Sequence, residues 1–368
     1  MENRKNIILH DTFLYKWWWE RLIIMMAKAL KADIASGFFS HWSFDLRLEW
    51  FEWKLISVSS EVFKKWLRHL KLKLAFLFNT KFLKNYDTII FSWDCISAVR
   101  NAREDAKKIF YCHTPPRYLY DLRELYLKKV PFILRPFFNL ASIFFRKMYE
   151  RDIKKMDLIL TNSINTKNRI KEFLWLEAHI VYPPVILDRF KYISTSDYYL
   201  SFARLAWAKR VDRIAEAFQK MPDKKLKIIH GINDPQKEEI IKLAKWYKNI
   251  EIISSPSDEE FYKYIWNCLA TIYIPVNEDF WMSPVESMAA GKPCIWVNEG
   301  WLKESIIDGK TGILINKWAE INDIIEAVKI LTPEKCLEMR TDCEARARDF
   351  SYEHFEKEIN DLVNNLTK

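Results

Sequence analysis

The chain has 368 residues, enough for about two domains of ordinary size, and a formal net charge of +9. Its hydrophobic share of 49% and charged share of 29% exclude a disordered chain, a collagen-like chain and a small disulfide-stapled domain. The charge favours anionic partners, such as phosphorylated ligands or an anionic membrane surface, and does not single out nucleic acid.

Apolar runs of four to six residues alternate with helical segments along the first half of the chain. This alternation is typical of a parallel sheet with helices on both faces. A helix is predicted at Glu20–Lys31, and the predicted strands are Asn6–His10, Leu55–Ser59, Thr88–Ser92, Lys108–Cys112 and Leu158–Asn162.

A polar stretch with Pro183-Pro184 interrupts this pattern over residues 181–197, where we expect an interdomain linker. The alternation then restarts, with predicted strands at Tyr198–Phe202, Leu226–His230, Ile250–Ile253, Thr271–Pro275, Cys294–Val297 and Gly312–Ile315. Helices are predicted between them at Val211–Lys220, Gln236–Tyr247, Asp258–Trp266 and Pro284–Ala290, and a final helical region at Pro333–Leu366. The predicted architecture has Rossmann-like domains at residues 1–190 and 191–345 that face a cleft, and a C-terminal helix at 346–368 that packs back on the first domain.

The cysteines and the apolar segments indicate the compartment. Met1–His10 does not resemble a signal peptide, and no Cys-x-x-Cys pair occurs, so reduced thiols in a cytoplasmic protein are expected. The most apolar stretch, Val130–Phe145, is interrupted by prolines and charges and is shorter than the ~20 residues of a membrane-spanning helix. This stretch and the basic, apolar stretch Lys64–Lys84 form either core helices or segments that lie on a bilayer surface.

Two carboxylates flank the start of a predicted helix in Asn277-Glu278-Asp279-Phe280-Trp281-Met282-Ser283-Pro284-Val285-Glu286. Glu278 and Glu286, eight residues apart, could bind two hydroxylated parts of one ligand, beside backbone N–H groups at the helix start. The structural alternative makes Ser283 the N-cap and Glu286 its capping-box partner, with Pro284 as the first helical residue. Spacing alone favours this structural alternative.

Cations and a histidine follow two other predicted strands. Arg204 and Lys209 lie on the loop after Tyr198–Phe202, where they could bind a diphosphate, although such loops are often only solvated. His113, in Tyr111-Cys112-His113-Thr114-Pro115-Pro116, follows Lys108–Cys112 and could hydrogen-bond a sugar hydroxyl. A lone histidine is more often structural.

Taken together, these motifs resemble the GT-B glycosyltransferases of family 4, which are retaining, nucleotide-sugar-dependent enzymes. The resemblance is carried by Arg204-x4-Lys209, Glu278-x7-Glu286, Met288-Ala289-Ala290-Gly291-Lys292-Pro293, Asn298-Glu299-Gly300-Trp301-x-x-Glu304 and Asp308-Gly309-x-Thr311-Gly312. Tyr111-Cys112-His113-Thr114-Pro115-Pro116 and Tyr182-Pro183-Pro184-Val185 are similar to the mannosyltransferase branch that builds surface polysaccharide.

The resemblance implies a role for each matching residue. Arg204 and Lys209 would bind the donor diphosphate and stabilise it as it leaves, so that no bound metal or cofactor is needed. Glu286 would hold the ribose hydroxyls, and Glu278 the transferred sugar. The backbone N–H groups of Phe280, Trp281 and Met282 would assist Glu278, and His113 would hydrogen-bond the sugar near the reacting carbon.

Tryptophan stands at several positions where the family has glycine. The chain has 16 Trp and 6 Gly, whereas an average chain is about 7% Gly. The family's N-terminal Gly-Gly loop, on the acceptor side, reads Trp17-Trp18-Trp19 here, and Trp281 and Trp301 stand at further glycine positions of the family. Tryptophan supplies neither the positive φ nor the close backbone approach that glycine allows. We therefore expect that the source organism reads UGA as glycine, so that Trp residues of this sequence stand for Gly and any of the 16 can be affected; the alternative is a divergent, inactive Trp-rich homologue.

The sequence thus predicts a retaining hexosyltransferase that moves mannose from GDP-mannose onto a lipid-linked or polysaccharide acceptor. The predicted enzyme is cytoplasmic and associated with the inner face of the cell membrane. The alternatives are a nucleotide-sugar epimerase of the same architecture and a non-catalytic nucleotide-sugar-binding protein. A dinucleotide-dependent oxidoreductase is disfavoured because the first strand-to-helix turn lacks a G-x-G-x-x-G motif, even with Trp read as Gly.

Overall fold

The structure is a computed structural model that describes residues 5–15, 18–45, 51–61, 65–232, 234–276 and 282–366. The chain forms two compact units. The first contains residues 1–183 and 355–368, and the second contains residues 184–354. The chain passes between the units at Pro183-Pro184, inside the stretch where the sequence places a linker and before the boundary predicted at residue 190.

The first unit is built on a seven-stranded parallel sheet with the strand order β3-β2-β1-β4-β5-β6-β7. Its strands are β1 (Asn6–His10), β2 (Ala32–Ser36), β3 (Leu55–Ser57), β4 (Thr88–Ser92), β5 (Lys107–Cys112), β6 (Leu158–Thr161) and β7 (His179–Ile180). Ile8 of β1 pairs with Ile34 and Ile90 on the neighbouring strands, and all three side chains are fully buried. Helices on both faces of a parallel sheet require such continuous apolar strands.

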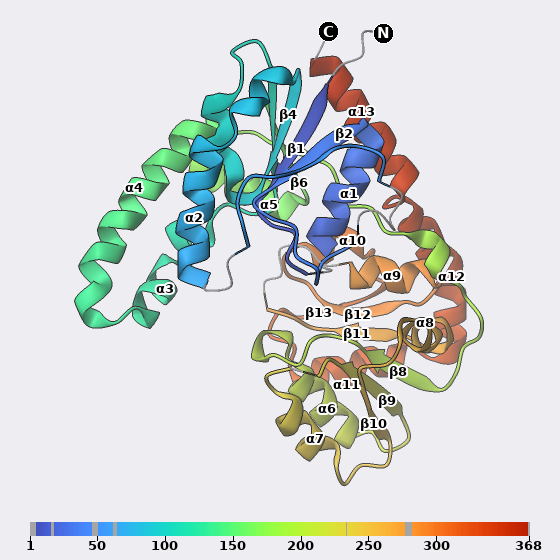
Figure 1. The fold of residues 1–368 in the computed structure, drawn as a ribbon. Coiled ribbons are helices and arrows are strands. Elements are labelled where there is room, and N and C mark those ends of the chain that lie inside the picture. The colour runs from blue at the N-terminus through green and yellow to red at the C-terminus, as the bar shows by residue number, and fades with distance from the viewer. Residues whose placement is uncertain are drawn as a thin grey trace. The chain divides into compact units, whose positions relative to one another are not determined.

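The helices of the first unit include a long one, α4, that follows the short helix α3 (Figure 1). They are α1 (Trp18–Leu30), α2 (Lys65–Phe78), α3 (Arg123–Lys129), α4 (Arg135–Ile153), α5 (Ile164–Leu174) and the end of α13 (Tyr352–Leu366), with 3-10 turns η1 (Lys81–Asn85), η2 (Trp93–Asn101), η3 (Arg117–Leu119) and η4 (Phe132–Leu134). The last helix, α13, lies beside α1, where the Asn360 side-chain amide donates a hydrogen bond of 3.1 Å to the Ala29 carbonyl (Figure 1).

The second unit contains a six-stranded parallel sheet with the strand order β10-β9-β8-β11-β12-β13. Its strands are β8 (Tyr198–Ser201), β9 (Lys225–His230), β10 (Ile250–Ser254), β11 (Thr271–Tyr273), β12 (Cys294–Val297) and β13 (Gly312–Ile315). Its helices are α6 (Val211–Gln219), α7 (Lys237–Ala244), α8 (Asp258–Asn267), α9 (Ser283–Ala289), α10 (Leu302–Ser305), α11 (Ile321–Ile330) and α12 (Pro333–Arg348), with 3-10 turns η5 (Leu187–Arg189) and η6 (Trp207–Lys209). In each sheet the order of the strands reverses beside the first strand, which makes a topological switch point where such folds bind ligands.

The predicted class of two parallel-sheet α/β domains is confirmed, and a few elements differ from the prediction. The sequence missed β2 because Lys31, with φ 49°, makes a one-residue turn between α1 and that strand. The predicted helical region Pro333–Leu366 is two helices. They are separated near Phe350, which is buried and accepts a backbone hydrogen bond of 2.8 Å from Val185.

Candidate active site

In the second unit, the predicted donor-binding residues follow β8 and β11, the two strands at the switch point. Lys209 ends the 3-10 turn η6 after β8, and its Nζ donates a hydrogen bond of 2.6 Å to the hydroxyl of Tyr273, the last residue of β11. The same Nζ lies 5.2 Å from the centroid of the Tyr273 ring. Because β8 and β11 are parallel neighbours, their carboxyl ends lie at one edge of the sheet, and Lys209 bridges them there.

The second predicted cation, Arg204, is 62% exposed and has a long ion pair, with its Nε 3.7 Å from Asp234 Oδ1. Asp234 is nearly buried and accepts hydrogen bonds from the backbone N–H groups of Leu205 (2.9 Å) and Gly231 (3.0 Å). The carboxylate therefore joins the loops after β8 and β9. It holds the Arg204 guanidinium only loosely, so an anion could bind the arginine without breaking a tight ion pair.

Arg210, next to Lys209, has a structural role that the sequence did not reveal. It is 8% exposed, and its guanidinium donates hydrogen bonds to the carbonyls of Ile274 (2.6 Å), Pro275 (2.8 Å), Lys317 (2.8 Å) and Trp318 (3.0 Å). Burial lowers the pKa of this guanidinium. Arg210 ties the loop that carries Lys209 to the loops after β11 and β13. Sequence alone could not distinguish Arg210 from the other cations of this loop because its partners lie more than 60 residues away in the chain.

The predicted capping box at the start of α9 is not formed. The helix begins at Ser283 with Met282 as its N-cap, and no side chain caps its first turn. The Ser283 carbonyl instead accepts a hydrogen bond of 2.9 Å from the Ser287 hydroxyl, and Glu286 lies half-buried in the first turn of the helix. Glu286 and Met282 both follow β11. The other predicted residues of this motif, Glu278, Phe280 and Trp281, lie outside the described residues.

In the first unit, His113 lies at the carboxyl end of β5 and belongs to a buried hydrogen-bonded chain. Its Nε2 lies 2.9 Å from the Ser92 hydroxyl, which is 3.1 Å from Nδ1 of His10. Burial lowers the pKa of both imidazoles: that of His10 falls to about 3, and that of His113 falls well below its usual value, with a smaller contribution from His10. Both rings are therefore neutral near pH 7. Nδ1 of His113 is buried and has no hydrogen-bond partner in the described part of the chain.

Aromatic rings surround His113. Trp93 stacks on the imidazole, with ring centroids 5.0 Å apart and planes 16° apart, and Trp18 meets it edge-on at 5.8 Å. Trp19 contacts both of these indoles, at 5.6 Å from Trp18 and 5.7 Å from Trp93. The sequence predicts Trp18 and Trp19 in an acceptor-side loop, whereas they are the first two residues of α1. Trp18 contacts His113 directly, Trp19 packs on Trp18 and Trp93, and Trp17 lies outside the described residues. The sequence did not indicate His10, Ser92 or Trp93 as members of this group.

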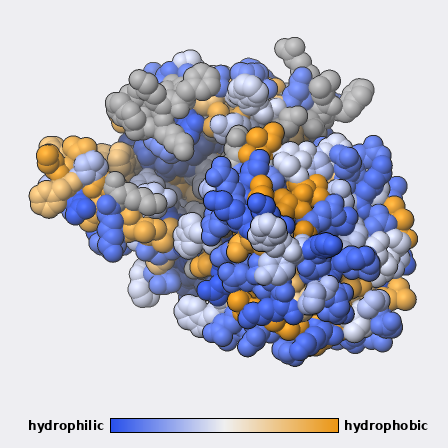
Figure 2. All heavy atoms as spheres, turned by 90° about the horizontal axis from the view of Figure 1, so that it is seen from below, coloured by the Kyte–Doolittle hydropathy of each residue, from blue (hydrophilic) through white to orange (hydrophobic). Residues whose placement is uncertain are grey.

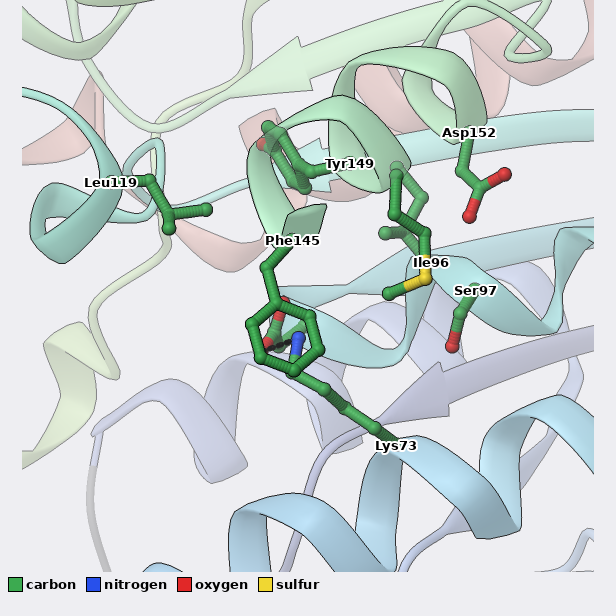
Figure 3. Close-up of a pocket in the computed structure, with 9 residues that line it drawn as sticks. Lys73, Ile96, Ser97, Leu119, Phe145, Tyr149 and Asp152 are labelled. Carbon is green, nitrogen blue, oxygen red and sulfur yellow. Dashed lines mark ion pairs between the residues drawn. The ribbon is translucent and has the colours of Figure 1, made fainter. Parts of the chain in front are cut away.

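A pocket in the first unit lies beneath α4 (Figure 3) and contains none of the predicted site residues. Lys73 on α2 forms an ion pair of 2.8 Å with Asp94 there, and its Nζ lies 4.8 Å from the centroid of the Phe145 ring. Tyr149 and Asp152 of α4 contribute buried side chains to the lining. The pocket marks the inner face of α4, which packs on η2.

The family described as glycosyl transferases group 1 matches residues 187–350, which lie in the second unit. The alpha-1,3/1,6-mannosyltransferase ALG2 of Dictyostelium discoideum is 39% identical over 103 residues, 27% of this chain and 24% of that protein. ALG2 of Homo sapiens is 24% identical over 311 residues, 74% of this chain and 71% of that protein. ALG2 of Mus musculus is 25% identical over 253 residues. The matches thus span about a quarter of the Dictyostelium protein and 58% of the mouse protein.

Two solved structures share the fold over nearly their whole length. Sucrose-phosphate synthase from Thermosynechococcus elongatus has a TM-score of 0.75 at 14% identity and covers 99% of both chains. Anabaena HepE in complex with UDP has a TM-score of 0.74 at 14% identity and covers 98% of this chain and 100% of that one. The GT-B fold predicted from the sequence is therefore confirmed.

Proposed function

We propose that this protein is a retaining glycosyltransferase that moves mannose from GDP-mannose onto a lipid-linked or polysaccharide acceptor. The observation that carries the proposal is the position of Lys209 and Arg204 at the switch point of the second sheet, where folds of this kind bind nucleotides. The mannose donor is supported by the names of the ALG2 relatives. HepE was solved in complex with UDP, which is a nucleoside diphosphate.

In the proposed mechanism the second unit stabilises the leaving group. Charge develops on the diphosphate as the bond to the sugar breaks, and two cations placed there stabilise it without a metal ion. Tyr273 positions the Lys209 ammonium by the hydrogen bond of 2.6 Å. Glu286 would hold the ribose hydroxyls, and Glu278 the transferred sugar. Departure and attack on the same face of the sugar would retain its configuration without a covalent intermediate.

His113 would hydrogen-bond the transferred sugar. Two observations support this role: its buried Nδ1 has no partner among the described residues, and its pKa is lowered by burial. A buried polar atom is nearly always hydrogen-bonded, so a missing partner points to a ligand or a water molecule. A neutral imidazole can serve as donor or acceptor to a hydroxyl according to its tautomer.

The outer face of α4 and the preceding turn η4 supports contact with an anionic bilayer. Side chains three, four and seven residues apart expose a continuous apolar surface: Phe132, Ile133, Leu134, Phe137, Leu140, Ile143 and Phe144. Ile133 is 81% exposed and Phe137 70%. In Figure 2 the apolar residues gather on the projection at the left, where Figure 1 places α3 and α4. We name this the α4 apolar face.

Basic residues border the α4 apolar face. Lys128, Arg146 and Lys147 are exposed at its two ends, and the Arg135 guanidinium lies 5.7 Å from the centroid of the Phe132 ring. Apolar side chains flanked by cations suit the boundary between acyl chains and anionic headgroups. No helix in the described ranges is long and apolar enough to cross a membrane. Contact at the surface would bring the enzyme to a lipid-linked acceptor.

Ligand-dependent thermal unfolding tests the donor proposal. We expect GDP-mannose to raise the midpoint of unfolding, and Lys209→Ala to abolish the rise while Lys242→Ala, an exposed lysine of α7, keeps it. A rise with UDP-sugars alone would correct the donor base. Conversion of a UDP-sugar without acceptor would assign an epimerase, and a midpoint unchanged by every sugar nucleotide would refute the proposal.

A further inference from the structure

Two tryptophans have a backbone conformation that side chains of L-amino acids rarely adopt. Trp93 has φ 67° and Trp175 has φ 57°, both in the left-handed region. There the Cβ atom approaches the following carbonyl oxygen, a clash from which glycine alone is exempt. Among the described residues, six that are not glycine have a positive φ, and two of these six are tryptophan, although tryptophan supplies only 16 of the 368 residues.

Trp175 ends helix α5 in the position that glycine usually takes. Its ψ is 34°, and its N–H donates a hydrogen bond of 3.1 Å to the Lys171 carbonyl, which is the left-handed helix cap. The residue is 88% exposed, so burial of the indole offsets almost none of the backbone strain. The conformation at this position follows from the cap and not from the side chain.

Trp93 is the first residue of η2, directly after β4, and its indole occupies the space over one face of His113. The ring centroids lie 5.0 Å apart and the planes are 16° from parallel. Glycine at position 93 would relieve the positive φ and leave this face of the imidazole open. On the proposed function, the opened space is where a sugar ring would reach His113.

Four glycines of the sequence occupy positions where a side chain would likewise be strained. Gly291, Gly300 and Gly309 have positive φ, and a Cβ added to Gly312 would collide with the backbone of Cys294. At these four positions the backbone favours glycine and the sequence has glycine. At positions 93 and 175 the backbone also favours glycine, but the sequence has tryptophan. Trp296 adds a separate signal because its indole N–H is buried without a hydrogen-bond partner in the described chain, which is unusual for tryptophan.

We infer that the native protein carries glycine at positions 93 and 175, as it would if its organism translates UGA as glycine, and that glycine at 93 uncovers His113 for a sugar ligand. The residue identities follow from the backbone and from composition. The ligand at His113 rests on the proposed function.

Peptide mass spectrometry of the protein isolated from its source organism tests the residue identities. The peptides that contain positions 93 and 175 are expected to have the mass of glycine at both. The mass of tryptophan at either position would overturn the inference for that position. No substrate is involved, so this result is independent of the proposed function.

Pairs of variants of the tryptophan-containing chain test whether the backbone at position 175 favours glycine. The Trp175→Gly variant is expected to unfold at a higher temperature than the Trp175→Ala variant, because alanine keeps the strain of a positive φ at this position. Trp246 is 81% exposed and is not among the positive-φ residues. There the Trp246→Gly variant should unfold at a lower temperature than the Trp246→Ala variant, because glycine makes the unfolded chain more flexible. The same order at both positions would contradict the inference.

Chemical modification tests whether Trp93 covers His113. Diethyl pyrocarbonate modifies neutral, accessible imidazoles, and His113 is 3% exposed in the present structure. We expect Trp93→Gly to increase the rate of modification at His113 several-fold, whereas Trp246→Gly leaves it unchanged. An unchanged rate in Trp93→Gly would show that position 93 does not control access to the ring.

Discussion

Lys209 Nζ lies 2.6 Å from the Tyr273 hydroxyl, so the side chain of a loop after β8 is held by the last residue of β11. The two residues are 64 positions apart in the chain. This contact orients one positive charge at the switch point of the second sheet, and it connects the fold directly to the proposed stabilisation of a leaving diphosphate.

Lys209→Ala should lower kcat/KM for sugar transfer by about 10²-fold or more, because it removes a cation that stabilises charge in the transition state. Steady-state transfer from GDP-mannose measures the effect. Lys242→Ala, on the exposed surface of α7, serves as the control and should retain full activity. Equal activity of the two variants would remove Lys209 from the mechanism.

Tyr273→Phe should have a smaller effect, about tenfold, because it removes one hydrogen bond and keeps the ring beneath the ammonium. Since the tyrosine acts by positioning Lys209, we expect the loss in kcat and little change in KM. In the Lys209→Ala background the same substitution should cost almost nothing further. A full additional loss there would show that Tyr273 acts independently of Lys209.

Arg210→Ala should destabilise the second unit by about 3 kcal/mol, because several carbonyls lose their donor at once and two of them are buried. Unfolding in urea, followed by a probe in this unit, measures the change. Arg348→Ala, at an exposed position of α12, is the matched control and should change stability by less than about 0.5 kcal/mol. Equal stability of the two variants would mean that the Arg210 contacts contribute little.

Glu20 should make stability depend on pH between about 4.5 and 7. Burial raises the pKa of this carboxyl from 4.5 to about 7. The folded state therefore holds a proton that the unfolded state has released, and the stability from this group is present below pH 4.5 and lost as the pH rises to 7. The loss amounts to about 3 kcal/mol at most. Glu20→Gln should flatten the curve of unfolding free energy in this range, and an unchanged slope would contradict the assignment.

The pair Phe137→Asp and Leu140→Asp, made together, should weaken binding to vesicles that contain anionic lipid by about tenfold or more, because two apolar anchors of the α4 apolar face are lost. Co-sedimentation with vesicles measures the effect. Leu337→Asp changes an exposed leucine on α12 of the second unit and should leave vesicle binding unaltered. If all variants bind vesicles equally, the α4 apolar face is not the contact.

The sequence by itself determined the parallel strands and the position of the cations after one of them. The runs Asn6–His10 and Thr88–Ser92 have apolar centres and Cys294–Val297 is apolar throughout, as a strand buried on both faces requires. Arg204 and Lys209 could be placed on a loop after a strand for the same reason. These predictions rest on neighbours in the sequence, where local apolar pattern and turn residues decide the outcome.

Only the tertiary structure decided which side chains meet. Three sets of contacts join residues that lie on, or on the loops after, different strands: the chain His10–Ser92–His113, the Arg210 hydrogen bonds and the Lys209–Tyr273 contact. Their proximity depends on strand order, and the apolar pattern of one strand does not specify its neighbours. The predicted capping box of Ser283 and Glu286 is not formed because α9 already begins at Ser283. Ser283 is therefore a helical residue and not the N-cap, although the spacing of the two residues suits a capping box.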